Sequence, residues 1–152
     1  FCNDRSVTGG SGYLTTPTTY YGAYTRLASN RKPSLKCAQD NDKFKVSNAS
    51  AKLDYPVSLI TADEVAMAGG VINTANSNYY LYNGQYFWTL SPSLLHSVNS
   101  NALISNVNFS GSLYLWRYVT DFIGTRPVIN LKADVQITKG DGTALNPFAL
   151  SV

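Results

Sequence analysis

Asp63 and Glu64 are adjacent carboxylates, the residue type that general acid–base catalysis uses. No partner for such chemistry lies near them in the sequence. Thr61 precedes Glu64 by three residues, which is the spacing of a capping box between a Thr hydroxyl and a Glu side chain. Carboxylates at a helix N-terminus also complement the helix dipole. The pattern therefore predicts structural roles for Thr61, Asp63 and Glu64.

His96 is the only histidine, and Ser91, Ser93 and Ser97 lie near it in the sequence. A serine hydrolase needs its nucleophile within hydrogen-bond reach of the base, and this spacing does not suggest such an arrangement. The Gly-x-Ser-x-Gly motif of a nucleophile elbow is absent. We therefore expect His96 to be a surface histidine, and we expect no catalytic residue and no enzymatic activity.

Cys2 and Cys37 are the only cysteines, and they lack the C-x-x-C spacing of a zinc site. They either form one disulfide, which would indicate an oxidising, extracellular setting, or remain two buried thiols. Oxygen ligands for calcium occur in residues 40–42 and at Asp141, but neither place has an EF-hand loop. Turn chemistry explains both, so no metal or other cofactor is expected.

The composition points to a surface that makes neutral hydrogen bonds. The chain of 152 residues has 14% charged residues, 11 tyrosines and a net charge of +3, whereas a typical soluble domain is roughly a quarter charged. Its basic residues are scattered, which argues against nucleic-acid binding. No stretch approaches the roughly 18 apolar residues of a membrane span, so we expect any anchor to lie outside this chain.

Tyrosine, asparagine and serine gather in residues 73–86, and this polar and aromatic run continues in residues 97–108 and 114–118. Aromatic rings give a large contact area at low entropic cost, and Asn and Ser supply hydrogen bonds. The alternative is that these rings pack between the sheet and its loops. The predicted ligand-binding residues are Tyr79, Tyr80, Tyr82, Asn83, Tyr86, Trp88, Tyr114 and Trp116.

The elements that would position these residues are mostly short strands. Residues 55–60 read as a buried strand, followed by a helix that starts at Thr61 and stops at Gly69 and Gly70. Further strands are expected at 43–46, at 86–91 with a stop at Pro92, and at 102–105, 107–109, 113–119 and 126–131. Gly140, Asp141 and Gly142 signal a hairpin. No alternating βαβ pattern indicates a nucleotide-binding sheet.

Arg126 precedes Pro127 within one of these apolar strands. A partly buried arginine needs a carboxylate or carbonyl partner. Asp63, Glu64 and Asp121 are the acids that would serve, so we expect Arg126 to form a structural pair.

Four blocks of this sequence together resemble the uncharacterised DUF6273 type of domain of bacterial surface and secreted proteins. They are residues 55–70, 88–92, 126–132 and 140–147. The resemblance covers about 55–148 and leaves out the cysteine-containing part, 1–54. The block order is similar, more distantly, to formylglycine-generating-enzyme-like domains, which implies a C-type-lectin-like α+β fold: a twisted antiparallel sheet with many loops and one or two short helices.

The active parts of those families do not carry over. The formylglycine enzymes use a cysteine pair late in the chain, whereas both cysteines here precede the matching region. C-type lectins use a Glu-Pro-Asn or Gln-Pro-Asp calcium loop, and no such tripeptide is present.

We therefore expect one domain over 1–152, acting as a non-enzymatic, extracellular ligand-binding or adhesive module of a bacterial surface protein or appendage. Its partner would be a cell-surface glycan or protein. The alternatives are a pilin-like structural subunit that assembles with copies of itself, and a phage receptor-binding domain.

Overall fold

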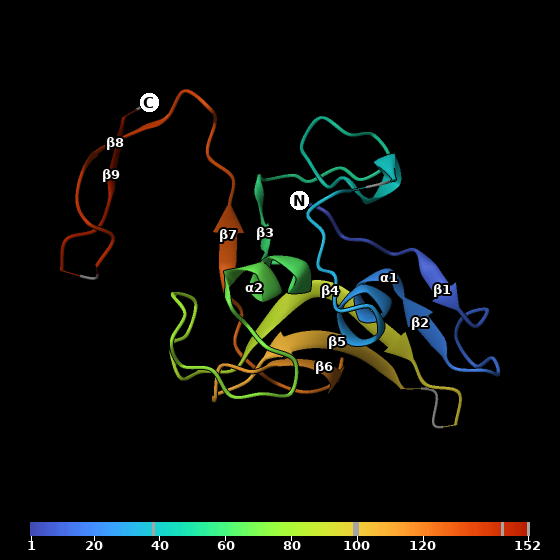
Figure 1. Ribbon diagram of the computed structural model, residues 1–152. Helices are drawn as coiled ribbons and strands as arrows, with labels where there is room; N and C mark the ends of the chain where they lie inside the picture. Colours follow the sequence, from blue (N-terminus) through green and yellow to red (C-terminus); the bar gives the residue numbers. More distant parts are fainter. Residues whose placement is uncertain (38, 99–100, 144, 152) are drawn as a thin grey trace.

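Five of the strands form one antiparallel sheet in the order β1-β2-β4-β5-β6. The computed structural model describes residues 1–37, 39–98, 101–143 and 145–151. Two short helices, α1 (Gly22–Tyr24) and α2 (Ala62–Ala68), lie on one side of this sheet (Figure 1). The sheet consists of β1 (Val7–Gly9), β2 (Thr19–Tyr21), β4 (Phe87–Leu95), β5 (Ala102–Val107) and β6 (Leu113–Tyr118). A mostly antiparallel architecture with short helices confirms the α+β class.

The core lies between this sheet and the helices. Phe87, Val107 and Leu113 are register partners on β4, β5 and β6 and are all buried, so they share one face of the sheet. Val65 of α2 packs in the same cluster, as does Leu27 of the π-helical turn Thr25–Ser29 that follows α1. Full burial of such a side chain contributes roughly 1.5–3 kcal/mol to stability.

Helix α2 begins and ends as the sequence predicts. Thr61 Oγ1 accepts from the Glu64 amide at 3.1 Å, and Glu64 Oε2 accepts from the Thr61 amide at 2.8 Å. Gly69 follows the helix with φ 117°, a left-handed conformation that costs glycine little. The predicted capping box is therefore confirmed.

Strands β3 (Val57–Leu59) and β7 (Pro127–Ile129) pair with each other in a separate two-stranded sheet. The expectation of two buried strands at 55–60 and 126–131 is wrong, because Val57 and Ile129, which are register partners, are 45% and 59% exposed. A ribbon of two strands meets the core on one side only. Ile60 and Val128 supply that side.

Strand β4 continues through Pro92, so the expectation that this proline ends the strand is wrong. The pairing of β4 with β5 shifts register on both sides of Pro92, and such irregularities tolerate a residue without an amide donor. Strand β5 is one strand where two short ones were expected. Lys43 and Lys45 make only isolated bridges, to Cys2 and Lys52, in place of the strand expected at 43–46.

The predicted C-terminal hairpin is present as β8 (Gln136–Lys139) and β9 (Ala149–Ser151). Residues 140–148 connect the two strands, so the loop is longer than a tight Gly-Asp-Gly turn. Figure 1 shows the hairpin standing away from the large sheet. Its register partners Ile137 and Leu150 are both exposed.

A disulfide joins Cys2 to Cys37, whose Cα atoms are 5.6 Å apart. Of the two states that the sequence leaves open, the structure has the bonded one. Beside it, the N-terminal amine of Phe1 donates to the Phe44 carbonyl at 2.9 Å, and the Asn3 amide donates to the Asp42 carbonyl at 3.0 Å. The first residues are thus fixed to the segment around the 3-10 turn Asp40–Asp42.

Replacing Thr61 by alanine is expected to lower the free energy of unfolding by about 1 kcal/mol, because the Glu64 amide loses its acceptor. Urea denaturation measures the change. Thr61→Ser keeps the hydroxyl and serves as the control. An equal loss in both variants would contradict a role for the cap.

Removing the disulfide with Cys2→Ser and Cys37→Ser together is expected to lower the free energy of unfolding by about 4 kcal/mol, since the unfolded chain regains the entropy of an open loop. Urea unfolding with and without reductant measures the loss. Reductant should destabilise the native chain and leave the double variant unchanged. A native unfolding transition that does not respond to reductant contradicts the bridge.

Candidate functional site

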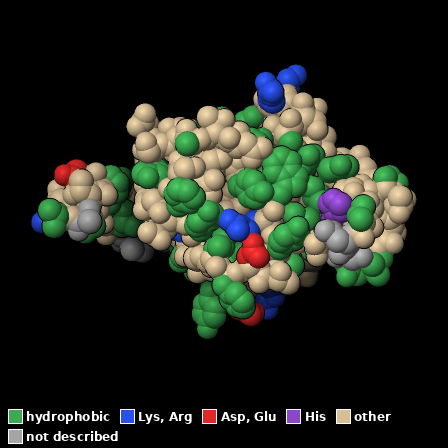
Figure 2. Space-filling model, turned by 90° about the horizontal axis from the view of Figure 1, so that it is seen from below, with side chains coloured by type: hydrophobic (Ala, Val, Ile, Leu, Met, Phe, Trp, Pro, Cys, Tyr) green, Lys and Arg blue, Asp and Glu red, His purple; other side chains and the backbone are tan. Residues whose placement is uncertain are grey.

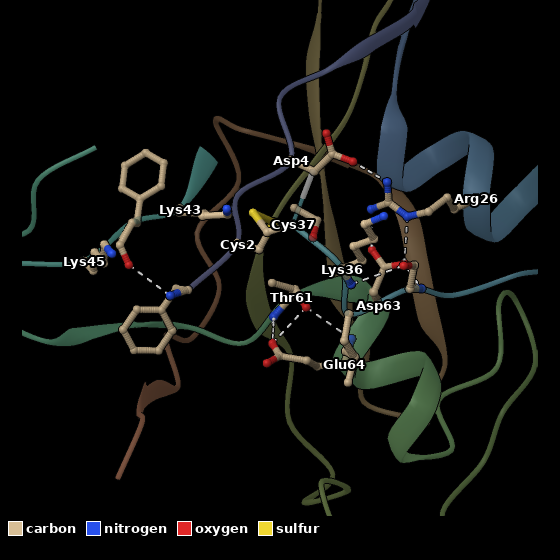
Figure 3. A pocket seen from close by; sticks show the side chains of 15 residues that line it. Cys2, Asp4, Arg26, Lys36, Cys37, Lys43, Lys45, Thr61, Asp63 and Glu64 are labelled. Atoms are coloured by element: carbon tan, nitrogen blue, oxygen red, sulfur yellow. Dashed lines mark hydrogen bonds and ion pairs between the residues drawn. A yellow bond between two sulfur atoms is a disulfide. The ribbon is translucent and has the colours of Figure 1, made fainter. Parts of the chain in front are cut away.

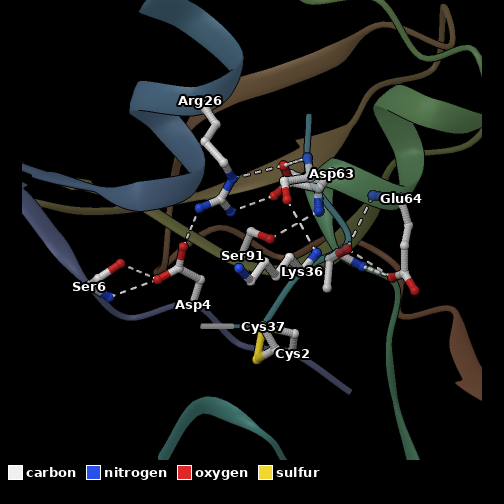
Figure 4. A network of polar contacts seen from close by, with 12 residues as sticks. Cys2, Asp4, Ser6, Arg26, Lys36, Cys37, Asp63, Glu64 and Ser91 are labelled. Atoms are coloured by element: carbon white, nitrogen blue, oxygen red, sulfur yellow. Dashed lines mark hydrogen bonds and ion pairs between the residues drawn. A yellow bond between two sulfur atoms is a disulfide. The ribbon is translucent and has the colours of Figure 1, made fainter. Parts of the chain in front are cut away.

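Asp63 lies in the first turn of α2 and is 3% exposed. Arg26, in the π-helical turn after α1, donates to its two carboxylate oxygens from Nε at 3.0 Å and from Nη2 at 2.7 Å. The Ser34 amide donates to Asp63 Oδ1 at 2.9 Å (Figure 4). Three donors therefore satisfy this buried carboxylate, as a structural role requires.

A second carboxylate, Asp4, contacts the same guanidinium through Arg26 Nη1. Ser6 also donates to Asp4, from its amide at 3.0 Å and from its hydroxyl. Gly22 makes this approach possible, because a Cβ there would lie 2.5 Å from Asp4 Oδ2. The hydrogen bond with Asp63, followed by that with Asp4, raises the pKa of Arg26 above its ordinary value.

A pocket of about 270 Å³ opens between this network and the disulfide (Figure 3). Its acids already have partners: Arg26 holds Asp4 and Asp63, while Glu64 completes the cap with Thr61. Ser91 also lines it, and its hydroxyl accepts from the Ala62 amide at 2.9 Å. The pocket is thus lined by groups that join the N-terminal part to α2.

Arg126 does not pair with any of the acids that were expected to serve it. Its Nη1 donates to the Leu81 carbonyl, and its guanidinium lies 5.2 Å from the centre of the Phe87 ring. Asp63 forms an ion pair with Arg26, and Asp121 forms one with Arg117 at 3.1 Å. The expected acidic partner is therefore wrong, whereas the carbonyl alternative is confirmed.

Six aromatic residues and one arginine form a continuous row of ring contacts, which we call the aromatic stripe. Ring centres lie 5.6 Å apart for Tyr86 and Phe109, 5.7 Å for Tyr114 and Trp116, 5.8 Å for Trp116 and Tyr24, and 4.8 Å for Tyr24 and Tyr20. Arg117 joins the two halves, with its guanidinium 4.8 Å from the Tyr86 ring centre and 6.0 Å from that of Tyr114.

Strand β6 supplies the middle of this stripe, and its register with β5 shifts between Tyr114 and Arg117. Leu113 and Leu115 are fully buried, whereas Tyr114 and Trp116 are half-buried. Trp116 lines two hollows, one of about 290 Å³ beside Arg117 and one of about 700 Å³ beside Tyr24. Figure 2 shows the side of the sheet turned away from the helices, where hydrophobic side chains surround a basic and an acidic group in contact.

The predicted ligand-binding residues divide into three groups. Tyr86, Tyr114 and Trp116 belong to the stripe, and Trp88 pairs in register with Asn106, the register partner of Tyr114, so it shares that face. Three further predicted residues are exposed and lie in the loop before β4: Tyr80, Tyr82 and Asn83.

Tyr79 is the exception, since it is 8% exposed and packs in the core. Its hydroxyl donates to the Gly111 carbonyl at 3.0 Å, and burial raises the pKa of the phenol. Tyr79 as a surface ligand-binding residue is therefore wrong, and the packing alternative holds for it. Of the predicted polar run 97–108, Asn99 and Ser100 lie outside the described residues.

Four members of the stripe were missed from the sequence: Tyr20, Tyr24, Phe109 and Arg117. Contacts between distant parts of the chain bring Tyr20, Tyr24 and Phe109 into the stripe, whereas Arg117 lies within the run 114–118 that the sequence already singles out.

The other residues considered for chemistry have local partners. The Val98 amide donates to His96 Nδ1 at 3.3 Å. Asp40 pairs with Lys43 at 2.7 Å, and Asp42 pairs with Arg5 at 2.9 Å. Within the part of the chain that the structure describes, no three His, Cys, Asp or Glu side chains gather as a metal site.

No family model, curated protein or solved structure matched this chain. Its resemblance to bacterial surface domains of the DUF6273 type therefore remains a prediction from the sequence blocks. None of the helices in the described ranges has the length and apolar character needed to cross a bilayer.

Acid is expected to weaken the Asp4–Arg26 contact. Burial opposes ionisation of Asp4, but the hydrogen bonds from Ser6 and Arg26 together outweigh it and lower the pKa of Asp4 below its ordinary 3.8. A carboxylate with a lowered folded-state pKa contributes stability above its unfolded pKa, and this stability is lost as the pH falls through the folded value.

The stability advantage of the native chain over Asp4→Asn should therefore be constant above about pH 5 and shrink below about pH 4. Urea unfolding of both proteins between pH 7 and pH 3 measures this gap. Asp54→Asn, at an exposed acid without an ion pair in the described residues, is the matched control. A gap that stays the same down to pH 3 contradicts the role given to Asp4.

Proposed function

We propose that this protein is a non-enzymatic, extracellular ligand-binding module and that its aromatic stripe binds a glycan. The observation that carries the proposal is the row from Phe109 to Tyr20, in which two groups of aromatic contacts are joined through Arg117. Half-buried rings with fixed neighbours lose little entropy when a ligand stacks on them.

The surroundings of Trp116 fit such a ligand. The two hollows that Trp116 lines would accept the bulk of a sugar chain, and Tyr114 and Tyr118 line the smaller one together with Asn108. Arg117 and Asp121 neutralise each other in that hollow while keeping donors and acceptors for hydroxyl groups. Apolar rings with a few placed polar groups are typical of ligand sites.

The setting of the proposal rests on the disulfide and on the sequence blocks. A disulfide persists in oxidising compartments, which supports an extracellular place. The antiparallel sheet with long loops agrees with the C-type-lectin-like architecture that the resemblance implies. We include that architecture, and membership of a bacterial surface protein, in the proposal.

A second candidate function, a structural subunit that assembles with copies of itself, is favoured by the C-terminal hairpin. Ile137, Phe148 and Leu150 are exposed on a two-stranded element, which is marginally stable by itself in water. Self-association without glycan binding would favour this function over the first.

Replacing Trp116 by alanine is expected to weaken glycan binding by about 30-fold, which corresponds to about 2 kcal/mol for a central aromatic contact. A glycan array with the isolated protein identifies the ligand, and calorimetry then gives the affinities. Tyr80→Ala is the control, because this residue is 78% exposed and lies outside the stripe. Urea unfolding checks that both variants fold.

Two results would contradict the proposal. One is the absence of glycan binding by the native protein. The other is a loss of affinity in Tyr80→Ala that equals the loss in Trp116→Ala, because a ligand that depends on both equally does not lie along the stripe.

A further inference from the structure

We infer that a further pocket, which adjoins the stripe at Tyr86, binds the carboxylate of an acidic sugar residue through Arg126. This inference rests on the proposed function and specifies its ligand as a glycan that carries a uronic or sialic acid. The pocket has a volume of about 450 Å³. We call it the Arg126 pocket, and the lining residues used below are Asn83, Gln85, Tyr86, Phe122, Thr125 and Arg126.

The chain forms this pocket by placing residues 122–126 beside the start of β4. Gly124 bridges to Phe87, and the Trp88 amide donates to the Gly124 carbonyl at 3.0 Å. On the opposite wall, Asn83 Oδ1 accepts from the Gln85 amide at 3.1 Å and shapes the turn before β4. Backbone bonds thus hold both walls.

Arg126 differs from three other arginines of the chain because it has no carboxylate partner in the described ranges. Arg5, Arg26 and Arg117 each contact a carboxylate. In the described ranges, no carboxylate lies within ion-pair distance of Arg126, and the residues outside those ranges contain no Asp or Glu.

Arg126 is nevertheless half-buried, and two contacts hold its guanidinium in place. The Leu81 carbonyl takes one of its five donors, and the Phe87 ring lies below it. A partly desolvated cation without a counter-ion is a strong site for an anion, and the planar fork of arginine matches a carboxylate.

The other lining residues of the pocket indicate which groups the remainder of the ligand would carry. Its other lining side chains carry no charge; Asn83, Gln85 and Thr125 offer hydrogen bonds, and the exposed Phe122 offers an apolar surface. One carboxylate, several hydroxyl or amide groups and an apolar face are the groups of an acidic sugar. A phosphate would face a single arginine and uncharged neighbours, which suits a monoanion better.

Tyr86 connects the pocket with the stripe. Its ring lines the Arg126 pocket and also contacts Phe109 and Arg117. A glycan chain that stacks along the stripe would therefore bring a neighbouring sugar residue to Arg126. The net charge of +3 further favours an anionic ligand.

The test compares an oligosaccharide that contains a uronic or sialic acid with the same oligosaccharide after reduction of its carboxyl group. Calorimetry with the native protein should show about tenfold tighter binding of the acidic form, as expected for a charge-assisted hydrogen bond. Arg126→Gln should bind both forms alike, and Arg126→Lys should keep part of the preference. Lys139→Gln, which removes one exposed positive charge from β8, should behave as the native protein.

Equal binding of the two forms by the native protein overturns the inference. A preference for the acidic form that survives in Arg126→Gln also overturns it. A short peptide with a free C-terminal carboxylate is the third probe, and tight binding of this peptide in place of the sugar also overturns it. If Trp116→Ala loses glycan binding while the acid preference is absent, only this inference fails. If no glycan binds at all, the proposed function fails with it.

Discussion

The guanidinium of Arg26 holds together three segments that are far apart in the sequence. It binds Asp63 at the start of α2 and Asp4 in the N-terminal segment, while the Ser34 amide shares Asp63. Taking an ion pair out of water is costly, and the attraction offsets that cost only when further hydrogen bonds complete it. The three donors on Asp63 meet this condition. The placement of α2 over the sheet and that of the disulfide-bonded N-terminal part therefore depend on one cation.

Local features were predictable from the sequence because their parts are close in the chain. The capping box of Thr61 and Glu64 spans three residues, and Gly69 ends the helix by its own conformational freedom. The partner of Asp63 was not predictable in this way. Arg26 and Arg126 are equal candidates by residue type, and only the turn after α1 brings Arg26 to the acid. Pairing of β3 with β7 instead of burial in the large sheet is likewise a matter of tertiary arrangement.

In the candidate site, too, local features were predictable from the sequence and tertiary contacts were not. Composition pointed to the tyrosines as a group, yet Tyr79 and Tyr80 are neighbours of which one is buried and the other exposed. An irregular loop has no period from which the direction of a side chain can be predicted. On β6 the strand period places Tyr114 opposite in direction to the buried Leu113 and Leu115. The register shifts between Tyr114 and Arg117, and Trp116, which lies within this shift, contacts Tyr24 of α1. Arg117 belongs to the stripe through its contacts with the rings of Tyr114 and Tyr86, and the contact with Tyr86 depends on the tertiary arrangement.

Tyr86 lies between two arginines, of which one is paired with a carboxylate and the other is not. Arg117 faces its ring and is neutralised by Asp121, whereas Arg126 lies in the neighbouring pocket with a carbonyl partner. A surface with few charges makes this difference effective, since charges more than about 8 Å apart are largely screened at physiological salt. In the proposed binding surface, uncharged rings and amides would supply most of the contact with a ligand, while the one arginine without a carboxylate partner would select a ligand that carries a negative charge. The proposal therefore separates affinity from charge selectivity, because the stripe would supply the first and Arg126 the second.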